Sequence, residues 1–347
     1  MEYRRTVNFI ELSQQSGQIH RLMFSNFCVL LSTLLMFMLA GSGCQPSTGQ
    51  SDTPKDFSNR KIKVVTTTSM IADLVREIGG EKVEVAGLMG PGVDPHLYKA
   101  SEGDVLRMAG ADIVVYNGLH LEGKMTEVFE QMDKRGIPTI AVAQDAIPDS
   151  LLLMSATYAG NFDPHVWFDV TLWQRVADHV QTVLSRLSPP DSDLFSTNAN
   201  AYIEEMAALH SYVQTQAATV PEAQRVLITS HDAFGYFGRA YKFEVQALQG
   251  LSTATEAGTA DVQDLAEFVA SRRIPAMFIE SSVSPRGIEA VKAAVQAKNF
   301  QVQIGGYLYS DALGDPEGSE GTYLGTVKYN IDTVVSALHP GTTQALE

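Results

Sequence analysis

The sequence predicts an α/β protein with two similar lobes, each built on a mostly parallel four-stranded sheet with helices on both faces. Three observations predict this fold. Short runs rich in β-branched residues alternate with amphipathic segments, a pattern typical of parallel strands covered by helices. This alternation occurs twice along the chain. Between the two series lies a stretch with helical periodicity alone, which we expect to form a long linking helix.

The first series forms the first lobe, which we expect to span 61–190. Its strand segments are short and apolar, and its helical segments carry apolar residues three or four positions apart. The predicted strands are 63–67, 83–88, 112–116 and 139–142. The predicted helices between them are 71–78, 102–108 and 124–134.

Two further helices are predicted at 172–187 and 193–218, and a Ser-Pro-Pro sequence separates them. The second of these helices lies within the expected linking segment, 191–220, and would be about 39 Å long at 1.5 Å per residue. Four of its apolar residues share one stripe. They are Tyr202, Met206, Leu209 and Val213.

The second series forms the second lobe, expected over 221–347. Its predicted strands are 225–229, 244–247, 276–280 and 301–304, and its predicted helices are 262–272 and 288–297. In parallel sheets ligands bind beyond the carboxyl ends of the strands, so paired lobes place a ligand site between them.

Composition excludes several functional classes. The chain has 347 residues, of which 45% are hydrophobic, and a net charge of −15, which argues against a nucleic-acid partner. Its two cysteines, Cys28 and Cys44, both lie within the first 44 residues. The remainder therefore has no disulfide framework and no thiolate metal site, and any metal there must be bound by nitrogen and oxygen.

The first 43 residues have the order of a signal peptide for export. An apolar run at 29–40 follows arginines and precedes small residues and then Cys44, and the run is short for a membrane span. This order resembles the lipobox of bacterial lipoproteins, in which the cysteine is lipidated, although Gly41 stands where that motif usually has leucine. An uncleaved anchor and an ordinary signal peptide are the alternatives. The polar segment 44–60 predicts a flexible tether.

Two copies of the tripeptide Asp-Pro-His distinguish His96 and His165 from the other histidines of the chain. Proline fixes its own φ and holds the preceding residue extended, so each histidine is presented from a stiffened loop. The aspartate can brace that loop through its carboxylate. The alternative is a pair of turns that happen to end in histidine.

His231 and Asp311 each follow a predicted strand, so two candidates from each lobe meet at the expected ligand site. Three imidazoles and one carboxylate suit Zn²⁺ well, and suit Mn²⁺ if the aspartate chelates through both oxygens. The neighbouring Ser230 and Asp232 do not make a hydrolytic triad with His231, because adjacent residues cannot adopt that geometry.

Over 62–338 the sequence resembles the metal-specific solute-binding proteins of ABC importers, the cluster that includes the TroA, ZnuA and PsaA types. The resemblance rests on six motifs. They are GLMGPGVDPHLY (87–98), NGLHLEGKM (117–125), FDPHVWFD (162–169), TSHDAFGYFGRAY (229–241), FIESS (278–282) and GGYLYSDALG (305–314). Histidine at the third ligand position, and no histidine-rich loop at 149–161, make the TroA type the nearest.

This resemblance implies that His96, His165, His231 and Asp311 bind one Zn²⁺ or Mn²⁺ per chain. It further implies a monomer without enzymatic activity, held by lipid on Cys44 at the periplasmic or extracytoplasmic face of a bacterial membrane, which delivers the ion to an ABC permease. A rigid linking helix is typical of the family.

Two other readings remain open at this point. A zinc hydrolase would use three histidines and an open position, but Asp311 takes that position and the sequence has no HExxH motif. Some relatives have been described as surface adhesins. Of the neighbouring side chains, we expect Trp167 and Phe168 to pack beneath the site, and Asp232 and Glu280 to accept hydrogen bonds from the ligand imidazoles.

Overall fold

The computed structural model describes residues 56–155 and 160–339. The predicted signal peptide, Cys44 and most of the predicted tether lie outside these residues. Within the described ranges, no helix combines the length and the apolar character that crossing a membrane requires.

The first lobe is built on a parallel sheet of four strands in the order β2-β1-β3-β4. The strands are β1 (Ile62–Thr66), β2 (Val83–Gly87), β3 (Ile113–Tyr116) and β4 (Thr139–Ala141). Successive side chains of a strand face opposite sides of the sheet, and here both sides are apolar. In β1, Val64 faces one hydrophobic cluster and Val65 faces another. This lobe confirms the predicted sheet to within two residues at each strand end.

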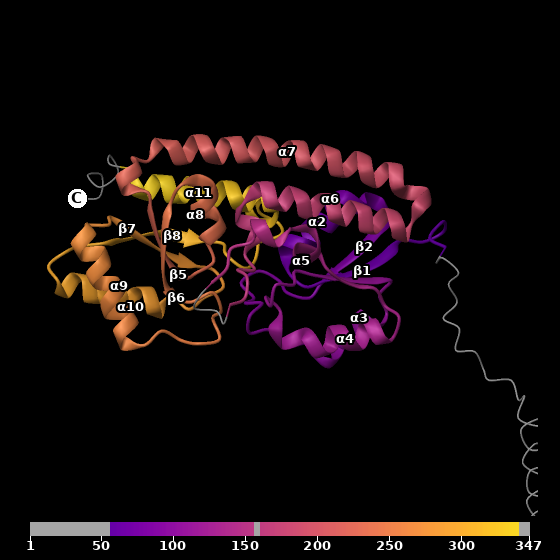
Figure 1. The fold of residues 1–347 in the computed structure, drawn as a ribbon, viewed down its shortest axis with the longest axis horizontal. Coiled ribbons are helices and arrows are strands. Elements are labelled where there is room, and N and C mark those ends of the chain that lie inside the picture. The colour runs from indigo at the N-terminus through magenta and orange to yellow at the C-terminus, as the bar shows by residue number, and fades with distance from the viewer. Residues whose placement is uncertain (1–55, 156–159, 340–347) are drawn as a thin grey trace, which may run out of the picture. The chain divides into compact units, whose positions relative to one another are not determined.

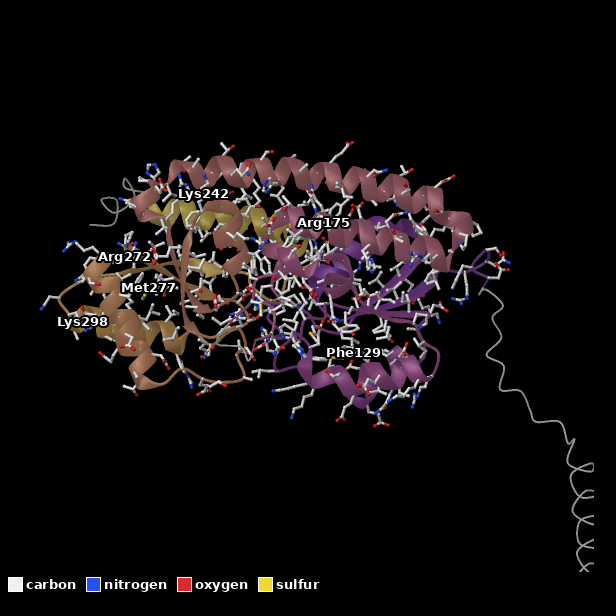
Figure 2. The ribbon with its side chains drawn as sticks, viewed as in Figure 1. Phe129, Arg175, Lys242, Arg272, Met277 and Lys298 are labelled. Carbon is white, nitrogen blue, oxygen red and sulfur yellow. The ribbon has the colours of Figure 1, made fainter. Side chains whose placement is uncertain are left out.

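Helices cover both faces of the first sheet. They are α2 (Ser69–Gly79), α3 (Glu102–Ala109), α4 (Thr126–Lys134), α5 (Val142–Ala146) and α6 (Val170–Leu187). Helices α3 and α4 pack on one face, to which α4 contributes Phe129 (Figure 2). The Phe129 ring stacks on Tyr116 of β3. Helices α2 and α6 cover the other face.

The second lobe has four parallel strands, which fall into two hydrogen-bonded pairs. They are β5 (Val226–His231) with β6 (Glu244–Gln249), and β7 (Ala276–Glu280) with β8 (Gln303–Leu308). Strands β5 and β7 lie in contact. At the end of β5, the backbone N–H of His231 donates to the side chain of Glu280 at 2.8 Å rather than to a strand carbonyl. The two pairs therefore lie side by side where the sequence predicted one continuous sheet of four strands.

Strand β8 ends four residues later than predicted, because it continues through Gly305 and Gly306. A Cβ on Gly305 would lie 2.7 Å from the Phe278 ring, and Gly306 has a φ of +143°. These glycines let the strand approach its neighbours closely where any side chain would be excluded.

Helices α8 (Gly235–Tyr241), α9 (Thr259–Arg272), α10 (Arg286–Ala297) and α11 (Tyr323–Leu338) complete the second lobe. Helices α9 and α10 cover one face of its strands, around Met277 (Figure 2). The sequence did not predict α5 or α11, whereas α8 is the helix expected to begin after His231. Helix α11 follows β8 in the chain and contacts α2 of the first lobe.

The long helix α7 (Ser192–Thr219) joins the lobes, as predicted. It runs alongside α2 and α6 of the first lobe and α8 and α11 of the second (Figure 1). The predicted stripe on α7 is buried and extends to Phe195 and Ala217. One hydrophobic cluster contains this stripe together with residues from both groups of strands, so the two lobes share a core.

A buried carboxylate ties this shared core together. Asp73 of α2 is 7% exposed and accepts hydrogen bonds from the Tyr202 hydroxyl of α7 and the Tyr323 backbone N–H of α11, both at 3.0 Å. Tyr323 is the first residue of α11, where a carboxylate also offsets the positive end of the helix dipole. Burial raises the pKa of Asp73, while the two hydrogen bonds oppose that shift. Asp73 thus connects α2, α7 and α11 from within the core.

Replacing Asp73 with alanine should lower the free energy of unfolding by about 2–4 kcal/mol, because it leaves the Tyr202 hydroxyl and the Tyr323 N–H buried without an acceptor. Urea unfolding would measure the change. Asp178→Ala, at an exposed position of α6, is the matched control and should change the free energy by less than about 0.5 kcal/mol. Equal effects of the two substitutions would contradict the role of Asp73.

Candidate metal centre

The four predicted ligands meet in one buried cluster. His96, His165, His231 and Asp311 each offer one ligand atom, and these atoms all lie within 4.8 Å of one another. His165 and His231 are fully buried, and Asp311 and His96 are 1% and 4% exposed. Within the part of the chain that the structure describes, no other group of histidine and carboxylate side chains is placed to hold a metal ion in this way.

The ligand atoms are spaced as the corners of a coordination polyhedron. Nε2 of His165 lies 3.2 Å from Nε2 of His96 and 3.4 Å from Nε2 of His231. The two oxygens of Asp311 lie 3.5 Å and 3.4 Å from Nε2 of His165 and His231. Zn²⁺ binds such atoms at about 2.0–2.2 Å, which separates tetrahedral ligands by about 3.3–3.6 Å. The observed spacings fit a divalent ion at the centre.

Both Asp-Pro-His loops use the same turn to present their histidines. Asp94 accepts a hydrogen bond from the His96 N–H at 2.8 Å, and Asp163 accepts one from the His165 N–H at 2.9 Å. Each aspartate thus braces the backbone two residues ahead, as expected for an Asx turn. Asp94 also accepts a 2.5 Å hydrogen bond from the Thr253 hydroxyl, which ties the first loop to the second lobe.

Two more carboxylates lie behind the ligand rings. Nδ1 of His165 is 2.7 Å from Oδ1 of Asp163, and Nδ1 of His231 is 2.5 Å from Oε2 of Glu280. A carboxylate that holds the proton on Nδ1 leaves the Nε2 lone pair free for a metal. Glu280 occupies the place predicted for it. For His165 the carboxylate is Asp163, which was not among the predicted acceptors.

The electrostatics of the cluster favour a cation at its centre. Burial lowers the pKa of His96 to about 3, so that imidazole is neutral. Burial also acts to lower the pKa of His231, but the carboxylates of Glu280 and Asp311 outweigh it and raise that pKa well above its usual value. Although burial opposes ionisation of Asp311, His231 holds the pKa of this carboxyl well below its ordinary value. Its Oδ1 atom is buried without a hydrogen bond, as a metal-binding oxygen would be.

Asp311 is braced from within the second lobe. The Ser282 hydroxyl donates to Oδ2 of Asp311 at 3.2 Å and lies 3.0 Å from the hydroxyl of Ser310. In addition, the Trp167 indole N–H donates to the Ser310 carbonyl at 3.0 Å. The His165 and Trp167 rings meet edge to face at 5.3 Å, so Trp167 does pack against the site as predicted.

Several residues that support the ligand loops were not predicted from the sequence, because they lie in other parts of the fold. Asn117, at the end of β3, donates from Nδ2 to the Pro164 carbonyl at 3.1 Å and so supports the loop of His165. Glu122 in turn accepts a hydrogen bond from the Asn117 N–H at 2.8 Å. Both residues belong to the NGLHLE sequence, which follows a predicted strand directly. That position could have indicated that they lie near the ligand site. Ser282 offered the same indication, because it ends the FIESS sequence directly after a predicted strand, whereas Thr253 lies in no such motif.

Comparison with known proteins gives a consistent result. The zinc-binding protein TroA of Treponema pallidum (strain Nichols) is 51% identical over 278 residues, which cover 80% of this chain and 89% of that protein. The manganese-binding lipoprotein MntA of Bacillus subtilis (strain 168) is 43% identical over 309 residues, 89% of this chain and 98% of that one. The solved structure of the periplasmic zinc-binding protein TroA from T. pallidum superimposes with a TM-score of 0.78, covering 80% of this chain and 99% of that structure.

The family described as zinc-uptake complex component A, periplasmic, matches residues 64–337, which include both lobes and all four residues of the cluster. Sequence, fold and family match therefore agree, and this chain belongs to the family of zinc-uptake complex component A, periplasmic.

Proposed function

We propose that this protein binds one divalent transition-metal ion outside the cytoplasm and delivers it to the membrane permease of an ABC importer. The observation that carries the proposal is the buried cluster of His96, His165, His231 and Asp311. Its ligand atoms all lie within 4.8 Å of one another, and four of the facing pairs are 3.2–3.5 Å apart. Membership of a family of solute-binding transport proteins supports the transport role. The ion is cargo, and no bond of a substrate needs to be broken at this site.

The donor set favours Zn²⁺ and is compatible with Mn²⁺. Three imidazole nitrogens follow the general affinity order in which Zn²⁺ binds more tightly than Mn²⁺. Both oxygens of Asp311 face ligand nitrogens, so a chelating carboxylate and a fifth bond are also within reach, which suits Mn²⁺. The names of the two relatives, one zinc-binding and one manganese-binding, are consistent with either cargo.

Capture and release of the ion depend on the fact that each lobe supplies two of the four ligands. His96 and His165 belong to loops of the first lobe, whereas His231 is the last residue of β5 and Asp311 follows β8 in the second. An ion at the centre therefore joins the lobes. Moving one ligand pair away from the other by a small distance removes half of the coordination shell, and we propose that the permease extracts the ion in this way.

The alternative of a zinc hydrolase has less support. A catalytic zinc site has three protein ligands and an open position for water. Here Asp311 takes that position, and it is 1% exposed with both oxygens facing ligand nitrogens. The arrangement is that of a closed four-ligand site. Nothing in the described residues favours the adhesin role.

The chain organisation that we propose places the binding body on a lipid anchor. Residues 1–43 are an export signal, Cys44 carries lipid, and the predicted tether 44–60 links the body to the extracytoplasmic face of the membrane. The end of this segment is already part of the body, because Phe57 is 5% exposed in the core and Arg60 donates to both oxygens of Asp112. The body comprises a first lobe at 61–190, the linking helix at 191–220 and a second lobe at 221–347, and it acts as a monomer. The manganese-binding relative MntA is named a lipoprotein, which supports the anchor.

His231→Ala should weaken Zn²⁺ binding by at least about a hundredfold, because it removes one inner bond and leaves a space that only water can fill. Isothermal titration with a competing chelator would measure the affinity and the expected stoichiometry of one ion per chain. His179→Ala is the control, since this half-buried histidine of α6 lies outside the cluster. Tight binding by the His231 variant would refute the assignment of the site.

Glu280→Gln should weaken Zn²⁺ binding by roughly tenfold to a hundredfold with all four ligands still in place. The neutral amide no longer holds the Nδ1 proton of His231 as a carboxylate does, so the Nε2 lone pair is presented less well. The same titration gives the affinity. Glu289→Gln, on the exposed surface of α10, should bind like the unmodified protein, and an unchanged affinity for Glu280→Gln would show that Glu280 has no part in presenting the ligand.

Cys44→Ala should release the protein from the membrane fraction of a bacterial host, or stall removal of its signal, because the alanine variant has no thiol for lipid to modify. Fractionation and immunoblotting would measure the distribution. Cys28→Ala is the control and should remain on the membrane. If the Cys44 variant fractionates like the unmodified chain, residues 29–40 are an uncleaved anchor.

A further inference from the structure

Trp167 bridges the two lobes directly behind the ligand cluster. It lies in the short 3₁₀ helix η4 (Val166–Phe168), which begins one residue after His165, and it is 2% exposed. Its indole N–H donates to the backbone carbonyl of Ser310 at 3.0 Å. Ser310 immediately precedes Asp311, so one side chain connects the loop of a first-lobe ligand to the loop of a second-lobe ligand.

The backbone of Trp167 is also hydrogen-bonded, to a residue of α11. Its carbonyl accepts a 2.7 Å hydrogen bond from the hydroxyl of Tyr323, a residue that is 1% exposed. The N–H of the same tyrosine donates to Asp73 at 3.0 Å. A continuous chain of hydrogen bonds thus runs from Asp73 in the shared core, through Tyr323 and Trp167, to the loop that carries Asp311.

We propose that Trp167 is a positioning residue that fixes the separation of His165 and Asp311, and thereby slows the departure of the bound ion. This inference rests on the metal-binding function proposed above. Trp167 does not touch the ion in this role. It acts through the Ser310 carbonyl on one side and through its edge-to-face contact with the His165 ring on the other.

The hydrogen bond from the Trp167 indole to Ser310 affects the distance between two of the ligands. Nε2 of His165 and Oδ1 of Asp311 are 3.5 Å apart, and both must stay within a few tenths of an ångström of the ion. If the indole N–H is removed, the Ser310 carbonyl loses its indole donor. The Ser282 hydroxyl still bonds Asp311, and Ser69 still accepts the N–H of Leu313 two residues further on, but the bond beside the His165 ring is lost. Ordering a looser loop at each binding event weakens affinity, because preorganisation is lost.

Release of the ion requires the same two loops to move apart. The His165 loop and the Asp311 loop cannot separate while the indole remains bonded to Ser310 and the Tyr323 hydroxyl remains bonded to Trp167. Separation of the ligand pairs therefore has to break at least one buried hydrogen bond in addition to the metal bonds. Trp167 thus contributes to the barrier that keeps the ion bound until the permease acts.

The chain contains a matched control. Trp173, its second tryptophan, is fully buried in α6, and its indole nitrogen has no hydrogen-bond partner among the described residues. Its ring lies 5.7 Å from that of Tyr323. Trp173→Phe therefore removes the same atoms from the same core, and loosens the packing around Tyr323, without removing a hydrogen bond to a ligand loop.

The experiment compares Trp167→Phe with Trp173→Phe in the chain without its proposed signal, 44–347, using Co²⁺ as a spectroscopic probe and Zn²⁺ for kinetics. The visible absorption of Co²⁺ reports the geometry of its ligands, and transfer of Zn²⁺ to a chelator reports its dissociation rate. We expect Trp167→Phe to alter the Co²⁺ spectrum and to release Zn²⁺ roughly fivefold to twentyfold faster, as loss of one buried hydrogen bond implies. Trp173→Phe should leave both measurements unchanged.

Two results would overturn the inference: a Trp167→Phe protein with the unmodified spectrum and rate, or equal changes in Trp173→Phe. Should Trp167→Phe fail to fold by circular dichroism, Tyr323→Phe replaces it under the same criteria, since that change removes only the hydroxyl bonded to Trp167. If the unmodified protein bound neither Co²⁺ nor Zn²⁺, the proposed function itself would be wrong. Failure of the inference alone is thus distinguishable from failure of the function.

Discussion

The structure depends on one constraint, which is that four polar side chains from separate segments of the chain must face one another in a buried cluster. Facing imidazole nitrogens 3.2 Å and 3.4 Å apart direct lone pairs at a common point, and a buried carboxylate lies beside them. Burial of such groups is costly unless a cation or a shared proton compensates. The surrounding fold therefore has to hold the ligands together against their own tendency to separate, and an ion at the centre relieves that cost.

The fold meets this constraint by merging the cores of its two lobes. The buried stripe of α7, with α11 and Asp73, belongs to one cluster that includes strands from both lobes. A connection of this kind resists bending far more than the paired extended segments of hinged receptors. A transition-metal ion is also small, so enclosing it needs no wide closure of the lobes. Adjustments of the ligand loops and a slight tilt are sufficient to complete or to break the coordination shell.

Sequence reasoning predicted those parts that local pattern determines. The apolar runs of β1 and β5 and the stripe on α7 are visible in the chain itself, and the Asp-Pro-His loops identify two ligands by their turn chemistry. Other features depend on distant residues. Strand β8 continues through two glycines because Phe278 and α11 lie against it. Asp163 was predicted to brace its loop, but its pairing with the His165 ring was not predicted, because that contact depends on a side-chain rotamer. These are tertiary effects, which local propensity does not contain.

The charges around the cluster explain why a divalent cation is the fitting cargo. Asp311 is the one anionic ligand, and it cannot by itself balance two positive charges. Asp163 and Glu280 stand immediately behind His165 and His231 and supply two more carboxylates through the imidazole rings. Both carboxylates orient the rings and offset the charge of the cation. They lie on the side of the rings away from the ion, so they do not bind it themselves. A monovalent ion would leave this buried negative charge uncompensated. A divalent ion balances most of it, and three imidazole nitrogen ligands select a transition metal over Ca²⁺ or Mg²⁺.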